Sequence, residues 1–119
     1  MNNENAPSIA VIGGGYWGKN LVRNFHALGA LHTICDVDEG TLEDLAAKHV
    51  GVRTTTDIDK VLSDQAIEAI AIATPAVTHG ALVRRVLESD KDVYVEKPLC
   101  LSISEGEELS GLALSLIHI

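Results

Sequence analysis

Short apolar runs alternate along this chain with segments whose apolar residues recur at helical spacing. Leu42, Leu45 and His49, for example, fall at positions i, i+3 and i+7, which predicts a helix with one packed face. Because strand and helix alternate throughout, the pattern predicts an α/β fold, a doubly wound parallel sheet with strand order 3-2-1-4-5. Strands are expected at residues 8–12, 31–35, 52–55, 69–73 and 92–96, and helices at 17–28, 39–49, 57–62, from shortly after 75 to about 89, and at 102–112.

A glycine-rich segment, residues 13–18, lies between the first predicted strand and the first predicted helix. Gly13, Gly15 and Gly18 satisfy the pattern G-x-G-x-x-G. In this context the first glycine allows a tight turn, the second lets a pyrophosphate approach the backbone, and the third lets the helix pack close to the strand. The start of the helix dipole also favours a phosphate. The pattern predicts a dinucleotide site, and the alternative is a tight turn without a ligand.

Asp36 stands at the end of the second predicted strand. A carboxylate there accepts hydrogen bonds from the adenosine ribose and repels a 2′-phosphate, which favours NAD over NADP. No arginine follows at once to receive such a phosphate. The alternative role of Asp36 is to cap the next helix, although Asp38 is equally placed to do so.

Two further motifs follow the fourth and fifth predicted strands, Thr74-Pro75 and Glu96-Lys97-Pro98. Ligands of open α/β sheets bind at the carboxyl ends of the strands, so both motifs should line the same crevice as the glycine segment. Taken alone, each motif could also simply mark a turn or the start of a helix. Thr74, for example, can cap a helix, and Pro75 suits the first turn of one.

Together these motifs resemble the Gfo/Idh/MocA oxidoreductases, named for glucose–fructose oxidoreductase and inositol dehydrogenase, over residues 8–113. The resemblance implies a Rossmann domain of an NAD(P)-dependent dehydrogenase acting on a sugar or polyol hydroxyl, with NAD favoured over NADP. It places Lys97 beside the nicotinamide and the substrate, to stabilise an alkoxide or help move its proton. The cofactor-binding residues expected from the motifs and the resemblance are Gly13, Gly15, Tyr16, Trp17, Gly18, Asp36, Thr74, Pro75, His79, Glu96 and Lys97.

His79 has two interpretations, a family position near the cofactor or a surface residue near a helix start. The run 16–25 is most similar to family members that act on nucleotide-linked amino sugars, such as UDP-N-acetylglucosamine 3-dehydrogenases. A non-catalytic module that senses NAD(H) is the alternative function. Glu96-Lys97-Pro98 argues against it, because a sensor needs no lysine beside the nicotinamide.

Family members carry a second α/β domain that supplies most of the substrate pocket and usually the oligomer interface. The 119 residues leave no room for it, so we expect a cofactor half that binds NAD without turning over a sugar, from a homo-oligomeric parent. Residues 1–7 are expected to be a loose leader. Residues 114–119 match the translation of a transposon-end sequencing adaptor, and a natural apolar helix end is the alternative.

The composition of the chain argues against some classes of binding partner. A net charge of −8 and a pI near 4.9 argue against nucleic acid or an anionic membrane. No apolar stretch reaches the roughly 20 residues that a membrane span needs. Cys35 and Cys100 form no C-x-x-C pair, and the start of the chain has no basic export signal, which favours a cytoplasmic location. The histidines have no ligand spacing, so no metal site is expected.

Overall fold

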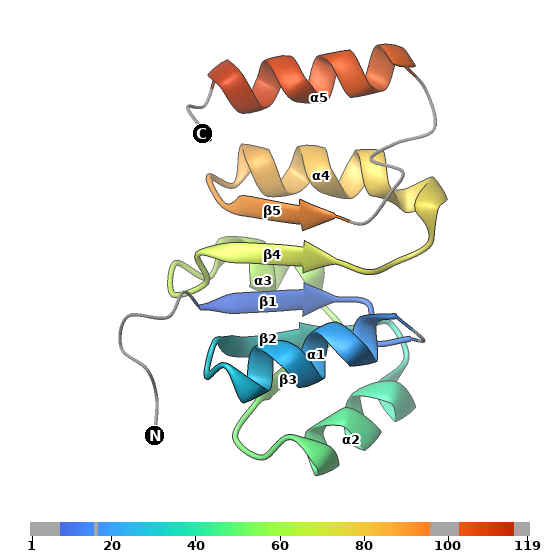
Figure 1. The fold of residues 1–119 in the computed structure, drawn as a ribbon, viewed down its shortest axis with the longest axis vertical. Coiled ribbons are helices and arrows are strands. Elements are labelled where there is room, and N and C mark those ends of the chain that lie inside the picture. The colour runs from blue at the N-terminus through green and yellow to red at the C-terminus, as the bar shows by residue number, and fades with distance from the viewer. Residues whose placement is uncertain (1–7, 16, 96–102, 116–119) are drawn as a thin grey trace.

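The computed structural model describes residues 8–15, 17–95 and 103–115. A five-stranded sheet in the order β3-β2-β1-β4-β5 forms its centre, and all neighbouring strands are parallel (Figure 1). The predicted fold class and strand order are confirmed. The strands are β1 (Ile9–Ile12), β2 (Leu31–Cys35), β3 (Arg53–Thr55), β4 (Ala69–Ile72) and β5 (Asp92–Val95). The helices are α1 (Gly18–Ala27), α2 (Glu39–Lys48), α3 (Ile58–Ser63), the 3-10 helix η1 (Ala76–Thr78), α4 (His79–Glu88) and α5 (Ile103–Ser115).

Helices cover both faces of the sheet, each over its own apolar core. Successive strand residues point to opposite faces, so a strand covered on both sides needs apolar residues at every position, as in β1 and β4. On one face α1 and α2 pack through Val11, Leu21, Val22, Ile34, Leu42, Leu45 and Ala71. On the other face α3, α4 and α5 pack through Ala10, Ile12, Cys35, Val61, Ile67, Ile70, Ile72, Val83, Val86, Leu87 and Leu109.

Two helices begin at an aspartate that satisfies an amide of their first turn. The Asp38 carboxylate accepts a hydrogen bond from the Gly40 amide at 2.9 Å, at the start of α2. The Asp57 carboxylate accepts one from the Asp59 amide, also at 2.9 Å, at the start of α3. These caps set where both helices begin, because the first N–H groups of a helix have no partner within it.

The segment after β4 differs from the prediction that Thr74 caps the next helix. Pro75 precedes η1, no side chain caps that turn, and α4 starts only at His79. The Thr74 hydroxyl instead shares a hydrogen bond of 2.6 Å with the hydroxyl of Thr78. A hydrogen bond within the turn, between residues four apart in the sequence, therefore replaces the helix cap.

The last helix, α5, packs beside α4 at the end of the molecule (Figure 1). Arg84 donates to the Glu108 carboxylate at 2.8 Å, and the Glu105 carboxylate lies so close to Gly80 that any Cβ there would overlap it. The helix runs to Ser115, past the predicted end at 112. Residues 1–7 and 116–119 lie outside the described residues, so the leader and the adaptor-derived tail stay predictions.

Buried Lys91 ties the loop before β4 to the start of β5. The residue is 5% exposed, and its ammonium group donates to the carbonyl oxygens of Asp64 and Ile67, both at 2.7 Å. A buried charge is costly unless hydrogen bonds compensate it. Lys91 therefore stabilises the amino-terminal edge of the sheet, opposite the edge with the glycine segment.

Lys91→Met is expected to lower the free energy of unfolding by about 1–3 kcal/mol, because it keeps the apolar stem but removes the donor of both hydrogen bonds. Urea unfolding followed by circular dichroism measures this loss. Lys48→Met, at an exposed position of α2, is the control and should change stability by less than about 0.5 kcal/mol. Equal losses in the two variants would contradict the assignment.

Candidate functional site

The glycine segment leaves the carboxyl end of β1 and leads directly into α1. Gly13 has a φ of +97°, a left-handed conformation that residues with side chains rarely adopt. Its amide donates to the Cys35 carbonyl at 2.8 Å, and a Cβ would lie 2.9 Å from the carbonyl group of Ala73. The fold itself therefore requires glycine at position 13.

Gly18 and Gly15 differ in what their missing side chains leave room for. A Cβ on Gly18 would overlap the carbonyl oxygen of Gly13, so this glycine lets α1 begin against the segment. A Cβ on Gly15 would meet no described atom within 4 Å, and the residue is exposed without a positive φ. Packing among the described residues does not explain Gly15, so backbone approach by a pyrophosphate stays its predicted role.

Asp36 joins the end of β2 to the glycine segment. One carboxylate oxygen accepts a hydrogen bond from the Gly14 amide at 2.7 Å, and the other accepts one from the Asp38 amide at 2.8 Å. The competing role, capping of α2, belongs to Asp38. Each carboxylate oxygen has a second lone pair, so Asp36 can still accept from ribose hydroxyls.

The turn after β4 brings Thr74 and Pro75 to the same edge. His79 is 3% exposed, and its Nε2 donates to the Thr74 carbonyl oxygen at 2.9 Å. The interpretation of His79 as a surface residue is therefore wrong. The buried imidazole instead holds the turn that carries Thr74 and Pro75.

These segments enclose a cavity of about 340 Å³ at the carboxyl edge of the sheet. Four of the predicted site residues line it: Gly13, Asp36, Thr74 and Pro75. The other lining residues are Ile12, Cys35, Val37, Thr56, Ile58, Leu82 and Arg85. Sequence reasoning missed all of these as site residues. Val37 and Thr56 closely follow the ends of β2 and β3, so the carboxyl-edge rule was the signal that could have found them.

Cys35 contributes an uncharged wall to this cavity. Burial raises the pKa of its thiol to about 11, and the neighbouring negative charges of Asp36 and Asp57 act in the same direction. The thiol therefore stays protonated at neutral pH and acts as a small apolar side chain rather than a nucleophile.

Some predicted site residues do not line this cavity. Trp17 immediately precedes α1 and is 47% exposed. Tyr16, Glu96 and Lys97 lie outside the described residues, as does Cys100, so their assigned roles stay predictions.

Two helix ends bring His26 and His49 together, with ring centroids 4.9 Å apart. Loss of solvent lowers the pKa of His49, and the charges of His26 and Lys48 lower it further. Within the described part of the chain, no group of three or more histidine, cysteine or acidic side chains is placed to hold a metal.

Comparison with known proteins decides the family. The model of the Gfo/Idh/MocA oxidoreductase family, described as having an NAD-binding Rossmann fold, matches residues 8–116. The chain belongs to this family. Its fold is accordingly a Rossmann fold, and NAD is the cofactor that the family domain binds.

Relatives in this family include sugar-related dehydrogenases. The chain is 35% identical over 112 residues to scyllo-inositol 2-dehydrogenase (NAD(+)) of Bacillus subtilis, a match covering 90% of this chain and 32% of that enzyme. It is 27% identical over 103 residues to UDP-N-acetylglucosamine 3-dehydrogenase of Acidithiobacillus ferrooxidans, covering 87% of this chain and 32% of the relative. The chain thus spans about a third of the length of these enzymes.

A solved Gfo/Idh/MocA-like structure supports the same conclusion. GenD2 from gentamicin A biosynthesis, in complex with NAD, superposes with a TM-score of 0.87 at 31% identity, covering 98% of this chain and 34% of GenD2. No helix among the described residues is both long and apolar enough to cross a bilayer. The open side of Gly15 and the position of Asp36 fit an NAD pyrophosphate and ribose.

Gly15→Ala and Gly18→Ala are expected to separate binding from folding. Gly15→Ala should change the free energy of unfolding by less than about 0.5 kcal/mol but weaken NADH binding about tenfold or more, because its methyl group occupies the space of the pyrophosphate. Gly18→Ala should cost about 2 kcal/mol or more, because α1 must shift.

Thermal unfolding and NADH titration of both variants provide the measurement. Unchanged NADH affinity in a folded Gly15→Ala variant would show that the open side of Gly15 is not where the cofactor lies.

Proposed function

We propose that this chain is the cofactor-binding half of an NAD-dependent dehydrogenase that oxidises a hydroxyl of a sugar, polyol or nucleotide sugar. The observation that carries the proposal is the Gly14–Asp36 hydrogen bond of 2.7 Å, which places a glycine segment and a carboxylate together at one cavity. That arrangement presents backbone amides to phosphates and a fixed acceptor to a ribose.

Three parts of the cofactor have different partners in this proposal. The pyrophosphate lies against the exposed backbone at Gly15 and the start of α1, where the helix dipole is positive. The adenosine ribose donates to Asp36. The adenine occupies the cavity of about 340 Å³, between Val37, Thr56 and Pro75.

The Thr74-Pro75 turn lies on the side of the cavity formed by β4, towards β5. His79 fixes this turn through the Thr74 carbonyl, so we propose that His79 positions the wall beside the cofactor without reacting itself. The bound nicotinamide supplies the hydride acceptor. Lys97, which follows β5 in the sequence, is proposed to hold the substrate hydroxyl and help remove its proton.

The substrate class rests on the relatives. One is named for scyllo-inositol and another for UDP-N-acetylglucosamine, so the shared chemistry is oxidation of a secondary hydroxyl on a polyhydroxylated ring. The local similarity of residues 16–25 to enzymes of nucleotide-linked amino sugars makes a nucleotide sugar our preferred substrate.

A titration of the purified chain with NADH tests the proposal. Trp17 is the single tryptophan and stands at the glycine segment, so bound NADH should quench its fluorescence. Asp36→Ala should weaken binding about tenfold or more, since a hydrogen bond to a charged group contributes about 1.5–3 kcal/mol.

Asp38→Asn is the control for this titration. Its amide oxygen can keep the cap of α2, and Asp38 does not line the cavity, so NADH affinity should stay within about twofold of the original chain. A folded chain that binds no NADH would contradict the proposed function, and equal losses in both variants would contradict the role of Asp36.

A further inference from the structure

Arg85 of α4 is one of two charged residues that line the cavity proposed for the adenine, and the other is Asp36. Arg85 also lines a separate hollow of about 420 Å³ between α3 and α4, together with Leu62, Ser63 and Glu88. Because Arg85 belongs to both linings, its side chain lies at the boundary between the cavity and this hollow.

An ion pair with Asp59, the second residue of α3, holds the Arg85 side chain at this boundary. One terminal nitrogen of the guanidinium donates to the Asp59 carboxylate, and the Arg85 side chain is 42% exposed. A guanidinium has five N–H donors and two flat faces, so one contact with a carboxylate does not use all of its binding capacity. Arg85 can therefore contact a ligand while it stays paired with Asp59.

Apolar side chains of the cavity wall lie beside both members of this ion pair. Leu82 precedes Arg85 by three residues, which places the two side chains on the same side of α4, and both line the cavity. Ile58, which immediately precedes Asp59, lines the cavity as well. Apolar walls suit the faces of a flat base, and a cation over such a face is attracted by its π electrons.

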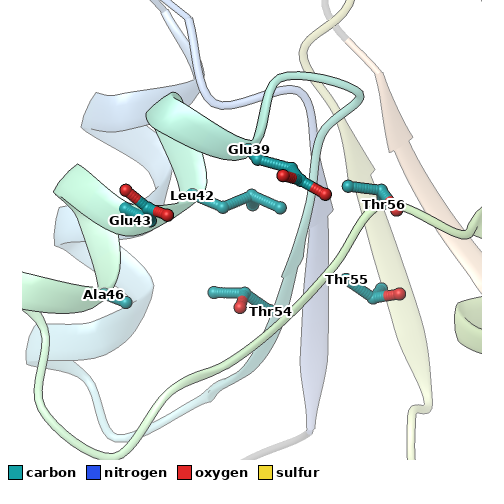
Figure 2. Close-up of a pocket in the computed structure, with 7 residues that line it drawn as sticks. All are labelled: Glu39, Leu42, Glu43, Ala46, Thr54, Thr55 and Thr56. Carbon is teal, nitrogen blue, oxygen red and sulfur yellow. The ribbon is translucent and has the colours of Figure 1, made fainter.

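On the side of α2 the cavity has a different neighbour, a pocket of about 420 Å³. Figure 2 shows Glu39 and Glu43 of α2 at this pocket, and Thr56 lines both the pocket and the cavity. The described residues that line this pocket include carboxylates and hydroxyls but no cation. Within the described lining of the cavity, only Arg85 can therefore place a positive charge against a base.

We propose that Arg85 is an adenine-binding residue, whose guanidinium lies against the base on the α4 side of the cavity while Asp59 holds it there. This inference rests on the proposed function, because it needs the adenosine half of NAD in the cavity. Asp36 and Arg85 then bind two adjoining groups of one nucleoside, the ribose and the base. Asp59 offsets the charge of Arg85, so the contact selects the flat base rather than the negative charge of the dinucleotide.

Arg85→Met in the full 119-residue chain tests this inference, because methionine keeps an unbranched apolar side chain without the guanidinium. The substitution should weaken NADH binding about fivefold, measured by isothermal titration calorimetry. ADP-ribose, which has the adenosine but no nicotinamide, should lose affinity by the same factor, because the contact is with the adenine. Arg85→Lys keeps the charge but has no flat group, so most of the loss should remain.

Arg84→Met is the matched control. Arg84 is the neighbour of Arg85 on α4, has a 40% exposed side chain and also forms an ion pair, with Glu108, but it does not line the cavity. Its NADH affinity should stay within about twofold of the original chain at about 0.15 M salt, where exposed charges away from the cavity are screened. Circular dichroism establishes that all variants are folded.

The outcomes separate the two proposals. Unchanged NADH affinity in folded Arg85→Met overturns the role of Arg85, while the proposed function stands because the chain still binds the cofactor. Full recovery in Arg85→Lys, or an equal loss in Arg84→Met, also overturns it, because charge alone then explains the effect. A loss for NADH without a loss for ADP-ribose overturns the contact with adenine. A folded original chain that binds neither ligand overturns the proposed function and this inference with it.

Discussion

The hydrogen bond from the Gly14 amide to the Asp36 carboxylate connects the two segments that the site is built from. It spans 2.7 Å and joins the turn after β1 to the end of β2. The Gly13 amide makes a second connection, to the carbonyl of Cys35 at 2.8 Å. With these bonds the glycine segment is held to the neighbouring strand, and the open side of Gly15 faces outward. The two hydrogen bonds that join the glycine segment to Cys35 and Asp36 therefore also preorganise the site.

The two ends of the sheet divide stability and binding between them. At the amino-terminal edge, Lys91 ties the loops before β4 and β5 through the carbonyls of Asp64 and Ile67. At the carboxyl edge, caps and turns leave a cavity instead of a packed surface. Asp36 and Arg85 are the charged residues among those that line this cavity.

Much of this arrangement is predictable from the sequence, because it depends on local patterns. Continuous apolar runs identify β1 and β4, and the spacing of Gly13, Gly15 and Gly18 identifies the turn to α1. What the pattern does not contain is the partner of each polar side chain. From the sequence alone Thr74 is a reasonable helix cap, but in the structure its hydroxyl shares a hydrogen bond with the hydroxyl of Thr78. His79 near a helix start is compatible with exposure, yet the fold buries it against the Thr74 turn.

The residues that line the cavity were also not predictable from sequence patterns. Ile58 and Leu82 come from helices on the face opposite α1, and only the three-dimensional packing brings them beside Asp36. The pocket between α2 and β3 depends likewise on where two elements meet. The role of Lys97, by contrast, was inferred from a motif and the family resemblance. Lys97 lies outside the described residues, so this role stays a prediction.

The central claim is that the dinucleotide binds against the glycine segment and Asp36, at the carboxyl edge of the sheet. An isotope-labelled sample of the chain, titrated with NADH and followed by two-dimensional NMR, tests this most directly. The account predicts that the largest shifts occur at the amides of Gly14, Gly15 and Val37. Shifts confined to Leu62, Ser63 and Glu88, which line a separate hollow between α3 and α4, or no shifts in a folded chain, would contradict it.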